Sequence, residues 1–284
     1  MTVIVTGASG GLGGRVARGL HAAGVPLRLV VRDASRAPRL SGAEVAVASY
    51  DDGAALLRAF ADADTLLLVS AAEHPQRLRQ HLTAVDAAAD AGVGHVVYTS
   101  FQGAAPDATF TLARDHAATE QRLHERGLVC TVLRDAFYQD ALTHVVDDAG
   151  VVRGPAGEGR VAAVARDDVA DSALAVLLAP AGHAGVTYDL TGPQALSMDD
   201  VAAALTSATG RPIRYEQESV EQAYASRAHY GAAPFEVEAW VSTYLAIAAD
   251  EMSEVTDAVA QLTGHQATSF ADYLSDPATW RHLL

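Results

Sequence analysis

Three glycines near the N-terminus have the spacing of a phosphate-binding loop. Gly7, Gly10 and Gly13 follow a β-branched run at residues 3–6 and precede a helical pattern. In such a strand–turn–helix unit, the first glycine allows an abrupt exit from the strand, the second keeps side-chain atoms away from a pyrophosphate, and the third allows close helix packing. The phosphates would bind the free N–H groups at the helix N-terminus. The alternative is a glycine-rich surface turn. A phosphate-loop NTPase is excluded because residues 13–16 read Gly-Gly-Arg-Val, without the required Gly-Lys-Ser/Thr.

The second apolar run, at residues 26–31, ends at basic side chains that would select the cofactor. A carboxylate at this strand tip would bind the ribose 2′-OH of NAD, whereas an arginine would pair with the 2′-phosphate of NADP. Arg32 comes first, and Arg36 lies one helical turn further on. We interpret this order as a preference for NADP(H). Two alternatives stay open, because Asp33 could face the ribose instead and an arginine at a strand end can be a solvated cap.

Apolar runs then alternate with helical patterns. Strands are predicted at residues 43–48, 64–69, 94–100 and 128–133, with helices at 53–61, at 74–92 and up to residue 127. Six strands alternating with helices at this spacing predict a doubly wound, parallel α/β sheet of the Rossmann type. Ligands of such sheets bind beyond the carboxyl ends of the strands. The residues found at the carboxyl ends of the fourth and fifth strands are Ser70, Ala71, Thr99 and Ser100.

Beyond residue 135 the pattern loosens. It predicts a loop at 151–159, a helix at 169–178, a strand at 186–190, a helix after a capping box at Ser197, a short strand at 212–215 and mostly helix over 219–262. We divide the chain into a dinucleotide-binding domain at 1–150, to which residues 160–190 return, and a smaller, mainly helical lobe on the substrate side at 191–284. An aromatic group in that lobe would form core, an interface or a ligand pocket. It consists of Tyr224, Tyr230, Phe235, Trp240 and Tyr244.

Composition and charge disfavour several classes of partner. The 284 residues include 20 Lys and Arg against 35 Asp and Glu, a formal net charge of −15, which argues against nucleic acids and anionic membrane surfaces. Cys130 is the only cysteine and lies in an apolar run, so we expect a buried thiol and no intrachain disulfide. We find no targeting segment and no apolar run long enough to span a bilayer, and we expect a cytoplasmic protein without a metal site.

The segment T-G-A-S-G-G-L-G at residues 6–13 resembles that of the short-chain dehydrogenase/reductase superfamily. Typical members carry a Tyr-x-x-x-Lys pair on the helix after the fifth strand, where the lysine lowers the tyrosine pKa and the tyrosine delivers a proton to a carbonyl. Here Leu112 stands at the tyrosine position and His116 at the lysine position. The usual tyrosine mechanism therefore cannot run from this helix, which also disfavours a sugar-nucleotide epimerase.

Four further segments narrow the resemblance. They are V-V-R-D-A-S-R at 30–36, V-V-Y-T-S-F at 96–101, D-H-A-A-T-E at 115–120 and L-R-D-A-F-Y at 133–138. As a set they resemble the NmrA-like group of atypical short-chain dehydrogenase/reductases, nearest to its type 2 NADPH:quinone oxidoreductases and triphenylmethane reductases. The resemblance covers most of residues 1–180 and is weak beyond about residue 210.

The resemblance implies a role for each residue of a cofactor site. The pyrophosphate would be held by Gly7, Ser9, Gly10, Gly11, Leu12 and Gly13. The 2′-phosphate would be held by Arg32 and Arg36, and the nicotinamide half would be lined by Ser70, Ala71, Thr99, Ser100 and Phe101. Phe137 and Tyr138 would flank the ring. Tyr50 and Asp51 are candidates for adenine contact, although Asp51 or Asp52 is equally a helix N-cap.

The implied catalytic candidates are His116 and Tyr138. His116 would take the ribose and carboxamide role of the missing lysine and would be the polar group nearest the hydride path. The alternative for His116 is a position on the helix surface.

The resemblance implies an NADPH-dependent oxidoreductase that transfers hydride to a quinone-like or other electron-poor, planar small-molecule acceptor. Such an acceptor needs mainly proximity to the nicotinamide, because its reduced product can take a proton from water. The alternative is an NmrA-type sensor that binds the dinucleotide without turnover and acts on a partner protein. A homodimer is compatible with either interpretation.

Overall fold

The computed structural model describes residues 2–284 and divides into two units. Unit 1 contains the chain up to Ser100 together with Asp115–Arg134 and Asp167–Tyr188, and unit 2 contains Phe101–Arg114, Asp135–Arg166 and Asp189–Leu284. The boundaries differ from the sequence division at residue 150, because residues 101–114 and 135–150 belong to unit 2. In both cases the chain changes units close to the carboxyl end of a strand of the main sheet.

The main sheet has seven strands in the order β3-β2-β1-β4-β5-β6-β9. They are β1 (Val3–Thr6), β2 (Leu27–Val31), β3 (Glu44–Val47), β4 (Thr65–Leu68), β5 (His95–Phe101), β6 (Cys130–Asp135) and β9 (Thr187–Leu190). β1 pairs in parallel with β2 on one side and with β4 on the other. The strand order therefore reverses direction at β1, as in a doubly wound sheet, and the predicted fold class is confirmed.

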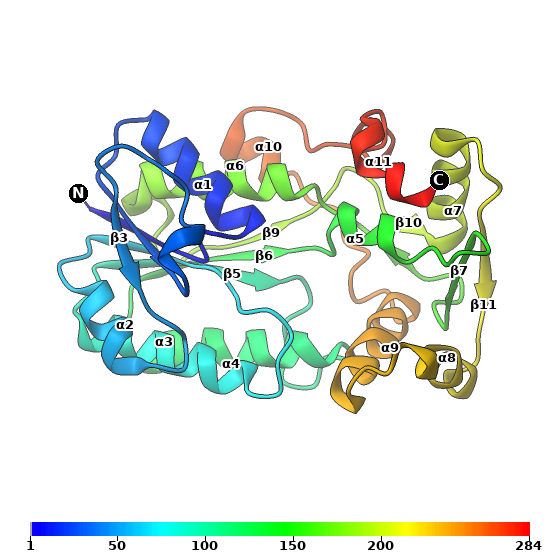
Figure 1. Cartoon of the computed structure of the whole chain (residues 1–284), viewed down its shortest axis with the longest axis horizontal. Coiled ribbons are helices and arrows are strands. Elements are labelled where there is room, and N and C mark those ends of the chain that lie inside the picture. The colour runs from blue at the N-terminus through cyan, green and yellow to red at the C-terminus, as the bar shows by residue number, and fades with distance from the viewer. Residues whose placement is uncertain (1) are drawn as a thin grey trace. The chain divides into compact units, whose positions relative to one another are not determined.

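Helices cover both faces of this sheet (Figure 1). They are α1 (Gly11–Ala22), α2 (Gly53–Phe60), α3 (Arg77–Asp90), α4 (Thr111–Glu125) and α6 (Arg166–Leu178), with 3₁₀ turns η1 (Ala34–Arg36) and η2 (Pro180–His183). α1 and α6 lie on one face, and α2, α3 and α4 lie on the other. All four residues of β4 are buried, as a central parallel strand requires.

Apolar side chains of the sheet and the α2–α3 layer form one core cluster of unit 1. Ile4 of β1 and Leu66 of β4 pack in it with Leu56 and Phe60 of α2, and all four are completely buried. Burial of such side chains stabilises the fold by about 1.5–3 kcal/mol each. Cys130 is buried as predicted, and burial raises the pKa of its thiol.

Unit 2 adds short sheets and several helices. β10 (Leu196–Ser197) pairs antiparallel with β8 (Arg160–Val161), and β11 (Arg214–Gln217) pairs in parallel with β7 (Val151–Gly154). The helices are α5 (Gln139–His144), α7 (Met198–Thr209), α8 (Val220–Arg227), α9 (Pro234–Ala248), α10 (Ala258–Thr263) and α11 (Phe270–Tyr273), with 3₁₀ turns η3 (Ala228–Tyr230), η4 (Pro277–Thr279) and η5 (Arg281–Leu283). The predicted capping box before α7 is confirmed, since Ser197 and Asp200 bond reciprocally.

One sequence prediction for unit 2 is wrong. The expected loop at 151–159 contains strand β7, because its partner β11 lies some sixty residues later, where a local pattern cannot reveal it.

The members of the aromatic group differ in burial. Tyr244 is buried in the core of unit 2 against Gly154, whereas Tyr224 and Tyr230 are exposed. The Tyr230 ring lies edge-on to Trp240, with centroids 6.0 Å apart.

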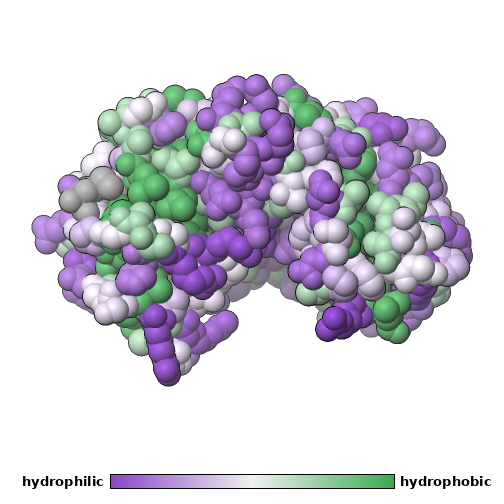
Figure 2. Space-filling view, turned by 90° about the horizontal axis from the view of Figure 1, so that it is seen from above, coloured by the Kyte–Doolittle hydropathy of each residue, from purple (hydrophilic) through white to green (hydrophobic). Residues whose placement is uncertain are grey.

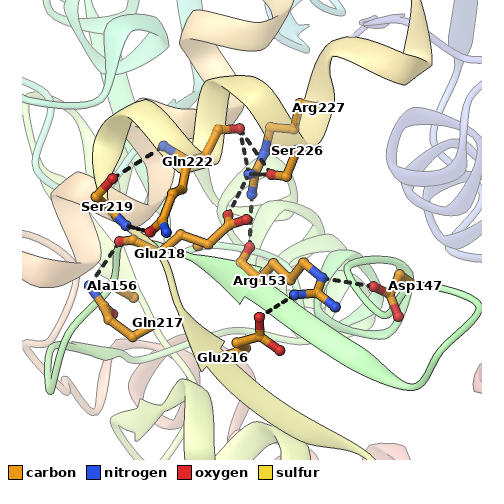
Figure 3. A network of polar contacts seen from close by, with 12 residues as sticks. Asp147, Arg153, Ala156, Glu216, Gln217, Glu218, Ser219, Gln222, Ser226 and Arg227 are labelled. Carbon is orange, nitrogen blue, oxygen red and sulfur yellow. Dashed lines mark hydrogen bonds and ion pairs between the residues drawn. The ribbon is translucent and has the colours of Figure 1, made fainter.

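A buried ion pair connects α8 to β7 and to the residue that follows β11 (Figure 3). Arg227 bonds Glu218 at 3.1 Å and the carbonyl of Arg153 at 2.8 Å. Both side chains of the pair are less than a tenth exposed. The guanidinium also lies over the Tyr244 ring, 5.2 Å from its centroid.

Hydrophilic side chains spread over much of the face shown in Figure 2, with hydrophobic residues between them. Across residues 2–284, no helix combines the length and apolar character needed to cross a membrane.

Candidate functional site

The glycine-rich loop connects β1 to α1 at the point where the strand order reverses. Gly7 has a φ of +59°, a left-handed conformation that favours glycine, and its carbonyl accepts the Gly10 N–H at 2.8 Å. A Cβ on Gly13 would lie 2.5 Å from the Gly7 carbonyl oxygen and 2.7 Å from that of Thr6. The conformational roles predicted for Gly7 and Gly13 are therefore confirmed.

The start of α1 offers backbone donors to an anion. Gly10 is the N-cap, without a side-chain cap, and its carbonyl accepts the Gly14 N–H. The N–H groups of residues 11–13 precede this bond and have no helical partner. Ser9, Gly10 and Gly11 are exposed, whereas Leu12 is buried, so Leu12 contributes only its backbone. The loop thus fits a pyrophosphate, because exposed residues 9–11 lead directly into a helix N-terminus whose first N–H groups have no helical partner.

At the end of β2 the two arginines are exposed, and one oxygen of the intervening carboxylate caps the following turn. Asp33 caps η1 by accepting the Ser35 N–H at 2.9 Å and the Ser35 hydroxyl at 2.7 Å. These bonds lower the pKa of Asp33. Arg32 and Arg36 are exposed on the same loop. In this conformation both arginines are available to a ligand, and one of the two carboxylate oxygens of Asp33 is engaged by Ser35.

Tyr50 and Asp51 both bond other parts of unit 1, and their contact with adenine stays a prediction. Tyr50 donates to the Val69 carbonyl at 2.7 Å and lies 2.6 Å from the Thr6 hydroxyl, so it links the ends of β1 and β4. Asp52, not Asp51, is the N-cap of α2.

The residues after β4 and at the end of β5 lie together, as predicted for neighbouring strands. The Ser70 N–H donates to the Thr99 hydroxyl at 2.9 Å, and Ala71 follows directly. Ser100 turns its hydroxyl toward Glu120 on α4, at 2.5 Å. Thr99 and Ser100 are buried, whereas Ser70 and Ala71 are half-buried. Among these four residues, Ser70 and Ala71 present the accessible surface.

His116 is buried in α4 rather than on its surface, so the alternative of a surface histidine is wrong. Its Nε2 lies 2.8 Å from Nη2 of Arg77 and its Nδ1 lies 2.8 Å from the Tyr98 hydroxyl. Burial and the nearby Arg77 charge hold its pKa well below the ordinary value, so the ring is neutral. Because the ring is neutral and both of its nitrogens bond other side chains, His116 does not supply the positive charge of a lysine. Its proposed contact with a cofactor stays a prediction.

The remaining predicted residues belong to unit 2. The Phe101 ring packs against Phe110 with centroids 5.0 Å apart, and Phe137 packs on the apolar core of this unit. Tyr138 donates its hydroxyl to Asp135. Arg166 lies over the Tyr138 ring, 4.0 Å from its centroid.

Asp135 is a titratable group that the sequence analysis missed. It is 4% exposed, and burial raises its pKa to about 7. Arg77 and His81 of α3 were missed too. Their spacing of four residues on a predicted helix, which places two polar side chains on one face, was the available signal.

These features define a dinucleotide-binding protein of the doubly wound class. A glycine loop lies at the strand-order reversal, a helix N-terminus follows it, and two exposed arginines follow the next strand.

The sequence profile of the NmrA-like family matches residues 1–276, and the chain belongs to that family. It is 32% identical over 276 residues to the NAD(P)H azoreductase of Xenophilus azovorans, covering 95% of this chain and 96% of that protein. It is likewise 32% identical over 281 residues to quinone oxidoreductase 2 of Escherichia coli, covering 96% and 97%.

Solved structures agree with the sequence relatives. The NADPH-dependent quinone oxidoreductase of E. coli, crystallised with NADPH, has a TM-score of 0.88 at 31% identity and covers 97% of this chain and 99% of that one. The triphenylmethane reductase of Citrobacter sp., complexed with NADP(H), has a TM-score of 0.86 at 30% identity and covers both chains completely.

Proposed function

We propose that the protein is an NADPH-dependent oxidoreductase that reduces quinone-like or other electron-poor, planar acceptors. The observation that carries the proposal is the identity of 32%, over nearly the whole chain, to two reductases that act with nicotinamide cofactors or on quinones. The glycine loop and the exposed arginines of unit 1 support it from the structure, because they fit a pyrophosphate and a 2′-phosphate.

We infer from the strand order that each half of the cofactor lies on one side of β1. With the pyrophosphate on the N–H groups of residues 11–13 and the 2′-phosphate on Arg32 and Arg36, the adenosine half lies toward β2. The nicotinamide half then extends toward β4 and β5, over Ser70 and Ala71. When bound, NADPH supplies a hydride from its nicotinamide ring, and hydride plus one proton converts a quinone to its hydroquinone.

The absence of a tyrosine at Leu112 fits this chemistry. An electron-poor acceptor needs positioning more than protonation, and its product takes the proton from water. The family resemblance adds Phe137 and Tyr138 as ring contacts. Because the Tyr138 hydroxyl donates to Asp135, we propose that Tyr138 contributes aromatic surface rather than the proton.

The first experiment mixes purified protein and NADPH with benzoquinones, naphthoquinones and an azo dye, and follows NADPH absorbance against a control without enzyme. Saturable, protein-dependent loss supports the reductase. Binding of NADPH, seen as tryptophan quenching, without turnover of any acceptor would instead favour the dinucleotide sensor.

We also propose a cytoplasmic location, supported by the single, buried cysteine. The homodimer stays a prediction, which light scattering tests.

A further inference from the structure

The segment that follows β4 is held by side chains rather than only by its neighbours in the sheet. The Val69 N–H donates to the Thr6 hydroxyl at 2.9 Å. The Ser70 N–H donates to the Thr99 hydroxyl at 2.9 Å, and the Ala71 N–H donates to Nε2 of His81 at 2.8 Å. Three consecutive backbone donors are therefore fixed by β1, β5 and α3.

Carbonyl groups of the same segment are fixed too. The Val69 carbonyl accepts the Tyr50 hydroxyl at 2.7 Å, and the Ala71 carbonyl accepts Nε of Arg77 at 2.9 Å. The Ala71 residue thus has both backbone polar groups bound by α3, through side chains one helical turn apart. This double attachment fixes the position of a half-buried backbone at the carboxyl edge of the sheet.

A buried polar network lies behind these two side chains. Arg77 bonds Asp115 at 3.2 Å and His116 at 2.8 Å, and His116 bonds Tyr98 at 2.8 Å. His81 bonds the Thr119 hydroxyl at 3.0 Å. The side chains of Arg77, His81, His116, Tyr98 and Thr119 are all at most 4% exposed.

The donors and acceptors of the network determine both histidine tautomers. Arg77 only donates, so Nε2 of His116 accepts and its Nδ1 carries the proton toward Tyr98. The Ala71 N–H donates to Nε2 of His81, whose Nδ1 then donates to Thr119. A second proton on either ring would place two donors face to face. Burial and the Arg77 charge accordingly lower the pKa of His81 to about 3 and that of His116 well below its ordinary value.

We propose that Arg77 and His81 are positioning residues, which fix the Ala71 backbone and thereby the nicotinamide half of bound NADPH, while His116 acts through Arg77. The inference rests on the proposed function, in which Ala71 lies under that half. It differs from the family expectation for His116, because the group that meets the cofactor is the Ala71 backbone. Buried polar side chains are costly, and an apolar α3–α4 contact could not hold both Ala71 groups.

Two amide substitutions of His81 separate this attachment from the rest of the network. In His81→Asn the amide replaces Nδ1, so it keeps the Thr119 contact but is too short to reach the Ala71 N–H. In His81→Gln the amide oxygen replaces Nε2 and accepts that N–H. The control is His95→Gln. His95 is a second buried histidine, located in β5, and its Nε2 bonds the Thr131 hydroxyl at 2.8 Å.

The measured quantities are the dissociation constants of NADPH and of adenosine 2′,5′-bisphosphate, which contains only the adenosine half. We expect His81→Asn to weaken NADPH binding about five- to tenfold, the effect of one lost hydrogen bond, and to leave bisphosphate binding unchanged. We expect His81→Gln to bind NADPH as the wild type does, and His95→Gln to leave the dissociation constants of both ligands unchanged.

Equal weakening of both ligands by His81→Asn would show a merely structural role and overturn the inference. Unchanged NADPH binding by His81→Asn would overturn the inference as well. The thermal unfolding midpoint of the variant is recorded alongside, to show that the variant is folded. The wild-type protein is measured before any variant is made. If it binds the bisphosphate but not NADPH, or binds neither ligand, the proposed function itself is contradicted.

Discussion

Replacement of Arg32 tests the assignment of the 2′-phosphate most directly. Arg32 is exposed at the end of β2, and the neighbouring Asp33 bonds Ser35 through one carboxylate oxygen. In Arg32→Ala the phosphate loses a charge-assisted partner, whereas the ribose of NADH gains none. The NADPH affinity should therefore fall while the NADH affinity stays nearly constant.

The size of the effect follows from the exposure of the site. Hydrogen bonds to charged groups contribute about 1.5–3 kcal/mol, and solvent screening at an exposed arginine favours the lower end of this range. A loss of about 1.5–2 kcal/mol corresponds to a drop of roughly 10- to 30-fold in the NADPH/NADH affinity ratio. Arg36 shares the same phosphate in our assignment, so the double variant should lose less than the sum of the single losses.

The assay is titration of tryptophan quenching by NADPH and by NADH at two salt concentrations, with Arg58→Ala as the control. Arg58 is an exposed arginine on α2, so its removal changes the net charge equally without touching the β2 loop. An affinity ratio that is unchanged in Arg32→Ala, or lowered equally in Arg58→Ala, would refute the phosphate assignment.

Three further predictions concern the loop, acid stability and unit 2. Gly13→Ala should weaken NADPH binding more than about tenfold, because its Cβ meets two carbonyl oxygens; Gly182→Ala, in open space without a positive φ, should bind normally in the same titration. The pKa of His81 is about 3 in the folded chain against an ordinary 6.5, so the unfolded chain takes up the proton first. The free energy of unfolding should be fully retained above about pH 6.5 and fall by up to about 1.4 kcal/mol per unit as the pH drops toward 3. Urea unfolding at about pH 7.5 and pH 5 should show a smaller loss in His81→Gln, and equal losses would contradict this pKa. Arg227→Met should destabilise the protein by about 3–5 kcal/mol, because Glu218 keeps a buried charge without its partner; calorimetry should show a smaller loss when Glu218→Gln is added.

The sequence was most informative where local pattern and structure coincide. The six strands predicted before residue 135 are present because each apolar run forms its own strand. Gly7 has the left-handed conformation, and Gly13 the close approach to other backbone, that their spacing suggested. β7 was missed because its pairing with β11 is not local. A Gly-rich stretch indicates a loop unless its remote partner is known, and here Gly154 is required by the ring of Tyr244.

The candidate site was less predictable because side-chain direction is not encoded locally. Ser100 lies at the carboxyl end of β5 and Tyr50 follows β3, as ligand-contacting residues do, yet both turn their hydroxyls toward other parts of unit 1. Arg77 and His81 lie within a helical pattern, where polar residues usually face solvent. Only the packing of α3 against the sheet and α4 shows that they are buried and bonded to Ala71.

The two departures from the Tyr-x-x-x-Lys pair are consistent with each other. A lysine in that pair lowers the pKa of the tyrosine, and with Leu112 in place of the tyrosine there is no phenol to activate. A lysine would therefore have no tyrosine pKa to lower here, and His116, a neutral hydrogen-bond acceptor, stands at its position. His116 accepts from Arg77, whose buried charge points to Asp115 and to the Ala71 carbonyl. The positive charge therefore serves to hold backbone rather than to move a proton. Under the proposed function, such a site would favour acceptors for which placement of the nicotinamide is sufficient for hydride transfer.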